Sequence, residues 1–158
     1  MKPRVEDENP SITLRRAAMD YLARREHSFH ELLYKLSEKY PQFDQDELIF
    51  PALLKLKNES LQSDQRFAES YVRYRRNKGF GPLKIEGELY QKGISSDLIK
   101  AELYTKENDW QELCKIAFEK KFVKFEHNFP QQQRYQRFLV QRGFTGEAIR
   151  AILRANNT

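Results

Sequence analysis

Apolar residues recur along this 158-residue chain at spacings of three and four, the period of an amphipathic α-helix. Runs of alternating β-branched residues, which would indicate strands, do not occur. The predicted buried face of the first helix, residues 13–25, comprises Leu14, Ala17, Ala18, Tyr21 and Leu22. The pattern predicts an all-α protein.

The predicted helices form three groups of three, over residues 11–60, 61–107 and 108–158, after a mobile N-terminal tail of residues 1–10. In the first group, Ser28 with Glu31 has the spacing of a capping box. A third helix is expected from about Asp44, with a kink or a late start at Pro51. Its predicted apolar residues are Leu48, Ile49, Leu53, Leu54 and Leu56.

The middle group contains the most distinctive segment, Gly79-Phe-Gly81-Pro82. Pro82 suits the first position of a helix, and Gly93 suits a left-handed cap at its end. Ser63 or Asp64 should cap the helix before this loop, and Ser95 the helix after Gly93. The predicted buried stripe of the first helix comprises Phe67, Ala68, Tyr71 and Tyr74.

The third group echoes the second, because Leu-Val-Gln-Arg-Gly143-Phe-Thr145 repeats the pattern of Leu-Tyr-Gln-Lys-Gly93-Ile-Ser95. It should begin near Asp109, and Thr145 should cap its last helix. Three registers align the groups: Leu36, Leu89 and Leu139; Ala18, Ala68 and Ala117; and the five-residue steps Phe43→Leu48, Ile94→Ile99 and Phe144→Ile149. Such agreement predicts tandem repeats of a three-helix unit, which usually build a binding surface.

These residues resemble the RecX family of regulatory proteins, which modulate the RecA recombinase. The resemblance rests on Arg25-Glu-His-Ser28, Asp64-x-Arg66-Phe67-Ala68, Gly79-Phe-Gly-Pro82, Lys92-Gly93-Ile94-Ser95 and Arg142-Gly143-Phe144. It spans most of the chain and is most specific in the middle group. It implies an elongated, curved helical array that binds the RecA–DNA filament and inhibits RecA's ATPase, strand-exchange and co-protease activities.

Positively charged residues are the candidate contacts to such a partner. On a helical wheel of about 100° per residue, Arg66 and Arg73 lie about 20° apart, opposite Phe67 and Tyr71. A second basic cluster comprises Lys115, Lys120, Lys121 and Lys124, with Arg134, Arg137 and Arg142 on the next helix. The predicted basic strip comprises Arg66, Arg73, Arg76, Lys78, Lys84, Lys121, Lys124 and Arg137. The alternative is that these side chains only form solvent-exposed helix faces and bind no partner.

Catalytic and cofactor signatures are missing from the sequence. It has no nucleophile elbow and no Walker sequence, and the Gly79-x-Gly81 loop lacks the Lys-Ser/Thr ending of a phosphate loop. His27 and His30 are three residues apart, but no Cys or carboxylate cluster completes a metal site. Cys114 lies in an apolar stripe as a buried thiol. We therefore expect no enzyme activity, no cofactor and no metal, and expect Gly79, Gly81, Pro82, Gly93 and Gly143 to be structural.

The charge balance permits an acidic partner without requiring one, since Lys and Arg number 28 against 23 Asp and Glu. The resemblance implies RecA and the RecA–DNA filament as partners, with weak binding to single- or double-stranded DNA beside them. Two alternatives remain: a repressor-like DNA-binding protein, with residues 95–104 as its recognition helix, and a helical scaffold for another acidic partner. The chain has no long apolar run and no signal peptide, so we expect a cytoplasmic monomer that does not bind membranes.

Overall fold

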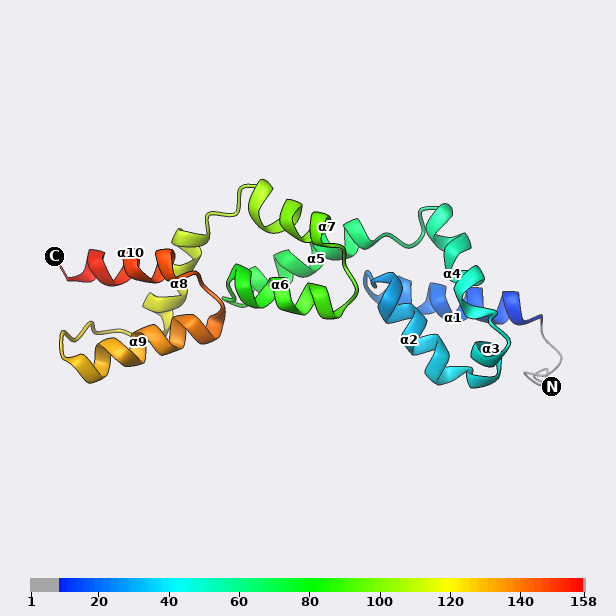
Figure 1. Ribbon diagram of the computed structural model, residues 1–158, viewed down its shortest axis with the longest axis horizontal. Coiled ribbons are helices and arrows are strands. Elements are labelled where there is room, and N and C mark those ends of the chain that lie inside the picture. Colours follow the sequence, from blue (N-terminus) through cyan, green and yellow to red (C-terminus); the bar gives the residue numbers. More distant parts are fainter. Residues whose placement is uncertain (1–8, 158) are drawn as a thin grey trace. The chain divides into compact units, whose positions relative to one another are not determined.

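The computed structural model describes residues 9–157, and within that range it consists of helices and connecting loops without strands (Figure 1). The chain packs as two compact units. The first comprises the described residues up to Ala68 together with Lys92–Ile94, and the second comprises Glu69–Gln91 and the residues from Ser95 onward. The all-α prediction is confirmed.

The first unit is built on α1 (Pro10–Arg24), α2 (Phe29–Lys39), α3 (Pro41–Gln45) and α4 (Ile49–Asn58). The Asn9 side chain caps α1, so Asn9 and Pro10 form the start of a helix rather than part of a tail; residues 1–8 lie outside the described range. The capping box at Ser28 and Glu31 is present as predicted. The buried core comprises Leu14, Ala17, Ala18, Leu32, Leu36, Phe43, Ile49, Leu53 and Leu56.

The third predicted helix of this unit was placed wrongly. Pro41 starts a separate short helix, α3, and the chain then turns at Glu47, whose φ is 56°. The helix that carries Pro51 begins only at Ile49, so the late start is confirmed. Because of this turn, Ile49 is buried in place of Leu48, which is 36% exposed. The step from Phe43 is therefore six residues and not five.

The second unit begins within α5 (Asp64–Asn77), which is followed by α6 (Pro82–Gln91), α7 (Ser96–Lys100) and a π-helical turn, η2 (Ala101–Thr105). Pro82 starts α6 and the Ser95 side chain caps α7, both as predicted. Tyr74 was predicted to be buried, but it is 55% exposed, and Val72 is buried instead. Val72 lies four residues after Ala68, so it continues the buried face of α5.

The π-helical turn leaves carbonyl groups that the following loop satisfies. The Asn108 side-chain amide donates to the carbonyls of Glu102 and Leu103 over 2.8 and 3.1 Å, and the Trp110 indole also donates to Leu103. The buried Glu102 carboxylate pairs with Lys106 at 2.8 Å. The turn is thus held by side chains from the loop that leads into the next helix.

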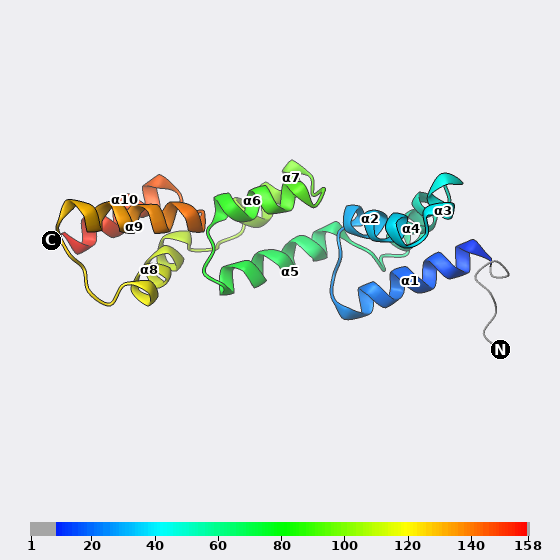
Figure 2. The same ribbon diagram turned by 90° about the horizontal axis from the view of Figure 1, so that it is seen from below.

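The last three helices, α8 (Trp110–Lys121), α9 (Phe129–Arg142) and α10 (Gly146–Asn156), pack together as one bundle (Figure 2). Asp109 caps α8 and Thr145 caps α10, as predicted. Tyr135 lies at the centre of the aromatic core, 5.2 Å from Phe118 and 4.7 Å from Phe122 between ring centroids. The three Leu positions and the three Ala positions that align the predicted repeats are all buried.

Two glycines that end helices make very close contacts. Gly93 (φ +78°) approaches His30 in the first unit, and an added Cβ would lie 2.7 Å from His30 Cβ. Gly143 (φ +92°) approaches Lys84 in the second unit, where an added Cβ would overlap the Lys84 backbone and Cβ. We call these the Gly93 contact and the Gly143 contact. Both positions need glycine for the left-handed backbone and for the close approach.

Gly81 forms the other half of the Gly143 contact. The Gly81 N–H donates to the Arg142 carbonyl over 2.7 Å, and the Leu83 N–H donates to the Gly143 carbonyl over 2.9 Å. An added Cβ on Gly81 would lie 2.6 Å from the backbone of Gly143. The loop from α5 to α6 is therefore bonded, backbone to backbone, to the loop from α9 to α10.

None of the helices described, from α1 to α10, is long and apolar enough to cross a membrane.

Candidate interaction surface

The predicted basic strip is distributed over several environments. Arg66 belongs to the first unit, where its guanidinium bonds the Glu26 carboxylate at 3.1 Å and the Ser60 carbonyl at 2.8 Å. These contacts join the start of α5 to the loops around α2 and α4. Arg66 thus has a structural task that the helical wheel could not show.

Arg73 and Arg76 differ although both lie on α5. Arg73 is exposed, whereas the Arg76 guanidinium lies 5.9 Å from the Trp110 ring and bonds the Asn108 carbonyl at 3.5 Å. Both line a shallow hollow of about 230 Å³ that also contains carboxylates, namely Glu69, Glu102 and Glu107. The mixed charge of this hollow makes it a weaker anion site than its arginines alone suggest.

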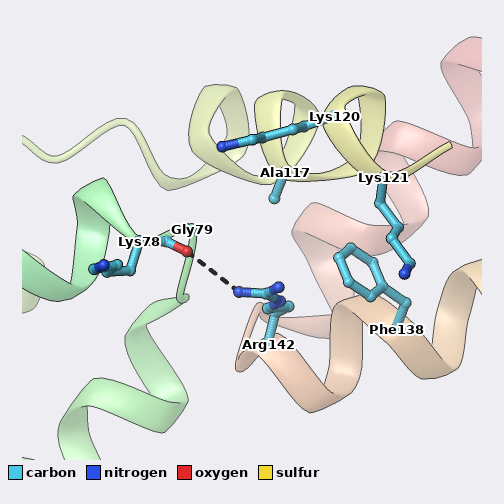
Figure 3. A pocket seen from close by; sticks show the side chains of 7 residues that line it. All are labelled: Lys78, Gly79, Ala117, Lys120, Lys121, Phe138 and Arg142. Carbon is cyan, nitrogen blue, oxygen red and sulfur yellow. Dashed lines mark hydrogen bonds between the residues drawn. The ribbon is translucent and has the colours of Figure 1, made fainter. Parts of the chain in front are cut away.

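A second hollow, of about 260 Å³, has no acidic lining (Figure 3). Lys120, Lys121 and Ala117 reach it from α8, and Phe138 and Arg142 from α9. The α5–α6 loop closes it with Lys78 and Gly79. We call this the basic hollow. Lys78 and Lys121 were predicted strip residues, and the structure brings them together here with Lys120 and Arg142.

Arg142 is held in place at the edge of this hollow. Its guanidinium donates to the Lys78 carbonyl over 3.2 Å, the dashed line in Figure 3. It also lies 4.8 Å from the centre of the Phe80 ring and 5.2 Å from that of Phe138. The Lys78 ammonium points elsewhere, 5.7 Å from the Tyr74 ring. The other three cationic residues that line the hollow are Lys120, Lys121 and Arg142.

Phe80 gathers further cations beside the basic hollow. Arg75 lies 3.7 Å and the Lys84 ammonium 4.9 Å from its ring centre. Arg75 is neutralised by two bonds of 2.9 Å to Glu88. Neither Lys84 nor Arg142 has a carboxylate partner within residues 9–157. Sequence reasoning missed the role of Phe80 because its partner Arg142 is 62 positions away; an aromatic residue between two glycines was the only local signal.

The remaining strip residues, Lys124 and Arg137, are exposed on the same bundle. Arg137 borders a shallow depression with Gln133, Gln136 and Val140.

The net positive charge of the chain is confined to the second unit. Residues 1–68 with 92–94 contain 12 Lys and Arg against 12 Asp and Glu, a net charge of zero. Residues 69–91 with 95–158 contain 16 against 11, a net charge of +5. The second unit alone therefore attracts polyanions over distance.

His27 and Cys114 are two of the buried titratable groups. His27 is buried, with Nδ1 3.0 Å from the Arg25 carbonyl and Nε2 2.9 Å from the Lys35 ammonium. Burial lowers the pKa of His27, and burial raises that of the Cys114 thiol to about 12. No group of three His, Cys, Asp or Glu side chains within the described residues could hold a metal ion.

The chain is similar to known proteins over nearly its whole length. Family models for the second and third three-helix domains of RecX match residues 63–103 and 107–153. Regulatory protein RecX of Pseudomonas entomophila (strain L48) is 41% identical over 143 residues, which are 90% of each chain. That of Legionella pneumophila (strain Corby) is 38% identical over 87% of this chain and 91% of its own.

Solved structures agree with this. A crystal structure of a regulatory protein RecX, 28% identical, superposes with a TM-score of 0.75 over 90% of this chain and 70% of its own. RecX from Lactobacillus salivarius, 24% identical, has the same fold, with a TM-score of 0.77 over 92% of this chain and 95% of its own. With its helical repeats and both family domains, the chain belongs to the RecX family of regulatory proteins.

Proposed function

We propose that this chain is a non-catalytic regulator that binds the RecA–DNA filament and inhibits RecA's ATPase, strand-exchange and co-protease activities. Its membership of the RecX family supports a regulatory role, since its relatives carry that name. The observation that carries the proposal is the uncompensated positive charge of the second unit, gathered around Phe80 and the basic hollow. A DNA-containing filament presents the matching negative charge. We expect the protein to act in the cytoplasm.

The repressor-like alternative has less support. The segment considered as a recognition helix, residues 95–104, consists of the short α7 and a π-helical turn. Its exposed side chains include Asp97 and Lys100, and it offers no Arg, Asn or Gln to base edges. The scaffold alternative makes no use of DNA, so it predicts binding that does not depend on a nucleoprotein filament.

The test is RecA's DNA-dependent ATP hydrolysis with increasing amounts of this protein. Inhibition well below one molecule per RecA subunit supports capping of filament ends, whereas inhibition only near stoichiometry supports coating of the filament groove. An unchanged hydrolysis rate together with an unchanged filament length would contradict the proposal. The Gly87→Ala variant is a control for the effect of a substitution as such, because a methyl group at Gly87 would meet nothing within 4 Å.

Avidity gives a second test. Contacts spread over several repeats add through effective concentration, so losing a repeat should matter much more than losing one arginine. A chain that lacks residues 108–158 but keeps its helical circular dichroism should inhibit far less than Arg73→Gln. Equal inhibition by the truncated and full-length chains would contradict binding through several repeats.

A further inference from the structure

We propose that the basic hollow is a binding site for phosphate groups of a nucleic-acid strand, and that its occupation fastens the Gly143 contact. This inference rests on the proposed function, because the filament supplies the strand. It adds a residue-level site and a structural consequence of binding.

The first argument is uncompensated charge. Lys120, Lys121 and Arg142 line one hollow that has no acidic lining. Arg75 lies against the same Phe80 ring as Arg142 but is neutralised by Glu88. Arg75 beside the hollow is therefore neutralised, whereas no carboxylate lines the hollow itself. Like charges around one hollow repel each other, and an anion between them removes that repulsion.

The second argument is preorganisation. The Lys78 carbonyl, Phe80 and Phe138 already fix the Arg142 guanidinium, so binding need not restrict it further. Ala117 leaves the floor of the hollow open between the two lysines of α8 (Figure 3). The lysines act as point charges and accept a phosphate in many orientations, which suits contacts that do not depend on base sequence.

The third argument concerns the class of ligand. One carboxylate of a peptide would balance only one of the three cations. A nucleic-acid strand brings a charge about every 3.4 Å along its axis, so neighbouring phosphates can serve several cations together. Lys84 beside the hollow, and the exposed Lys124 and Arg137 on the same bundle, extend the positive surface. An acidic protein segment would in addition call for an apolar core to its interface, and the hollow offers only Ala117 and Phe138.

The lining also links two repeats. Lys78 and Gly79 belong to the α5–α6 loop, whereas the three cations come from α8 and α9. The same two segments meet through the bonds from the Gly81 and Leu83 amides. A strand that contacts these three cations and also Lys84 of α6, beside the hollow, would engage both sides of the Gly143 contact and oppose its opening.

The experiment measures binding of the full chain to fluorescein-labelled oligothymidylate at increasing salt. The test variant is Lys120→Gln with Lys121→Gln, and the matched control is Lys100→Gln with Arg154→Gln. All four side chains are exposed in the second unit, so we expect both variants to fold, and both lose equal charge. Losing two phosphate contacts should reduce the slope of log K against log salt by about 1.4, or roughly 25-fold in affinity at 0.1 M relative to 1 M salt. The control should leave the slope nearly unchanged.

Hydrogen exchange gives an independent readout of the linkage. Oligothymidylate should slow exchange of the Gly81 and Leu83 amides severalfold in the wild-type chain and in the control, but not in the hollow variant. Unchanged exchange in the wild-type chain at saturating oligothymidylate would overturn the linkage.

Other outcomes overturn the site itself. Equal loss of binding in both double variants would mean that only diffuse charge matters. Unchanged DNA binding by the hollow variant, with loss of binding to poly-glutamate, would assign the hollow to an acidic protein. If the wild-type chain leaves RecA hydrolysis unaffected while oligothymidylate binding depends on Lys120 and Lys121, the proposed function fails and the hollow stands. If the wild-type chain inhibits RecA hydrolysis but the hollow variant binds DNA normally, the proposed function stands and the hollow fails as the DNA-binding site.

Discussion

The Gly93 contact and the Gly143 contact use the same backbone device but are secured by different chemistry. At the Gly93 contact, the Glu31 carboxylate lies between Arg25 at 2.8 Å and Lys92 at 3.6 Å. At the Gly143 contact, two backbone hydrogen bonds and an arginine packed on aromatic rings take that place. One helix–glycine–helix pattern can therefore be secured either by carboxylate ion pairs or by backbone hydrogen bonds and an arginine packed on aromatic rings.

The difference also separates charge that is used from charge that is free. The unit of the Gly93 contact has a net charge of zero, and its cations near the contact are paired. The unit of the Gly143 contact has a net charge of +5, with cations left open at the basic hollow. Stability of the first contact should therefore depend on pH, and binding at the second on salt.

Substitution of the close-approach glycines should have the largest effect. Gly143→Ala combines a left-handed backbone with overlap on Lys84, so we expect a loss of about 3 kcal/mol in the free energy of unfolding. Gly81→Ala isolates close approach, because its backbone is not left-handed, and should lose about 2 kcal/mol. Gly79→Ala isolates the backbone, because its methyl group meets only Arg142 at 3.8 Å, and should lose about 1 kcal/mol. Urea unfolding measures each loss.

The control for this series is Gly87→Ala in α6. Its methyl group meets nothing within 4 Å and its position is inside a helix, so the variant should gain about 0.5–1 kcal/mol. A series in which Gly143→Ala is as harmless as Gly87→Ala would refute the Gly143 contact.

Glu31→Gln should weaken the Gly93 contact by about 2 kcal/mol at pH 7, because a mostly buried carboxylate loses two cationic partners. Burial raises the pKa of Glu31, but hydrogen bonds from Arg25 and Ser28 outweigh it and lower the pKa to about 2. A lowered carboxylate pKa adds stability that is present above pH 4.5 and is lost as the pH falls towards 2. The difference between wild type and variant in urea unfolding should shrink over that window. A difference that stays constant down to pH 2 would rule out the ionic account.

Arg142→Lys should weaken the Gly143 contact by about 1 kcal/mol with no change of net charge. Lysine cannot pack a planar group against Phe80 and Phe138 while donating to the Lys78 carbonyl. The loss should be the same at pH 4 and pH 7, unlike that of Glu31→Gln. Arg150→Lys, at an exposed position of α10, is the matched control.

His27 should give the smallest effect, a mild loss of stability in weak acid. Burial lowers its pKa, so the unfolded chain takes up a proton first as the pH falls below the ordinary value of 6.5. Stability of the wild-type chain should therefore decrease from about pH 6.5 downward, and His27→Asn should remove this part of the dependence. His30→Asn, an exposed position in the first turn of α2, three residues after His27, serves as the control. An equal pH dependence in all three proteins would show that His27 is not the cause.

Local signals in the sequence predicted most helix ends correctly. The caps at Ser28, Ser95 and Thr145 were predicted because a capping side chain and its amide lie within three residues of each other. The error at α3 and α4 arose because a proline start and a left-handed Glu47 split one apolar pattern in two. The boundaries of the three repeats, and the elongated, curved arrangement that the resemblance implies, stay predictions.

The candidate site was only partly predictable. Helical spacing grouped Arg66 with Arg73, but the distant Glu26 decides that Arg66 is part of the internal packing. Conversely, Lys78 and Lys121 were predicted as members of one strip that did not include Arg142, and only the packing of α9 brings Arg142 to the hollow that both lysines line.

The helical class, the repeat, the family and the glycines that end helices were all evident from the sequence, because each is carried by short motifs of neighbouring residues, some of which recur along the chain. Tertiary structure decided which glycines also touch another backbone, and which cations are neutralised or left open. The physical reason is range: capping and amphipathic period act within about one helical turn, whereas contacts such as Gly81 with Gly143 join residues far apart in sequence. Only the folded chain could therefore turn a scattered excess of positive charge into one basic hollow.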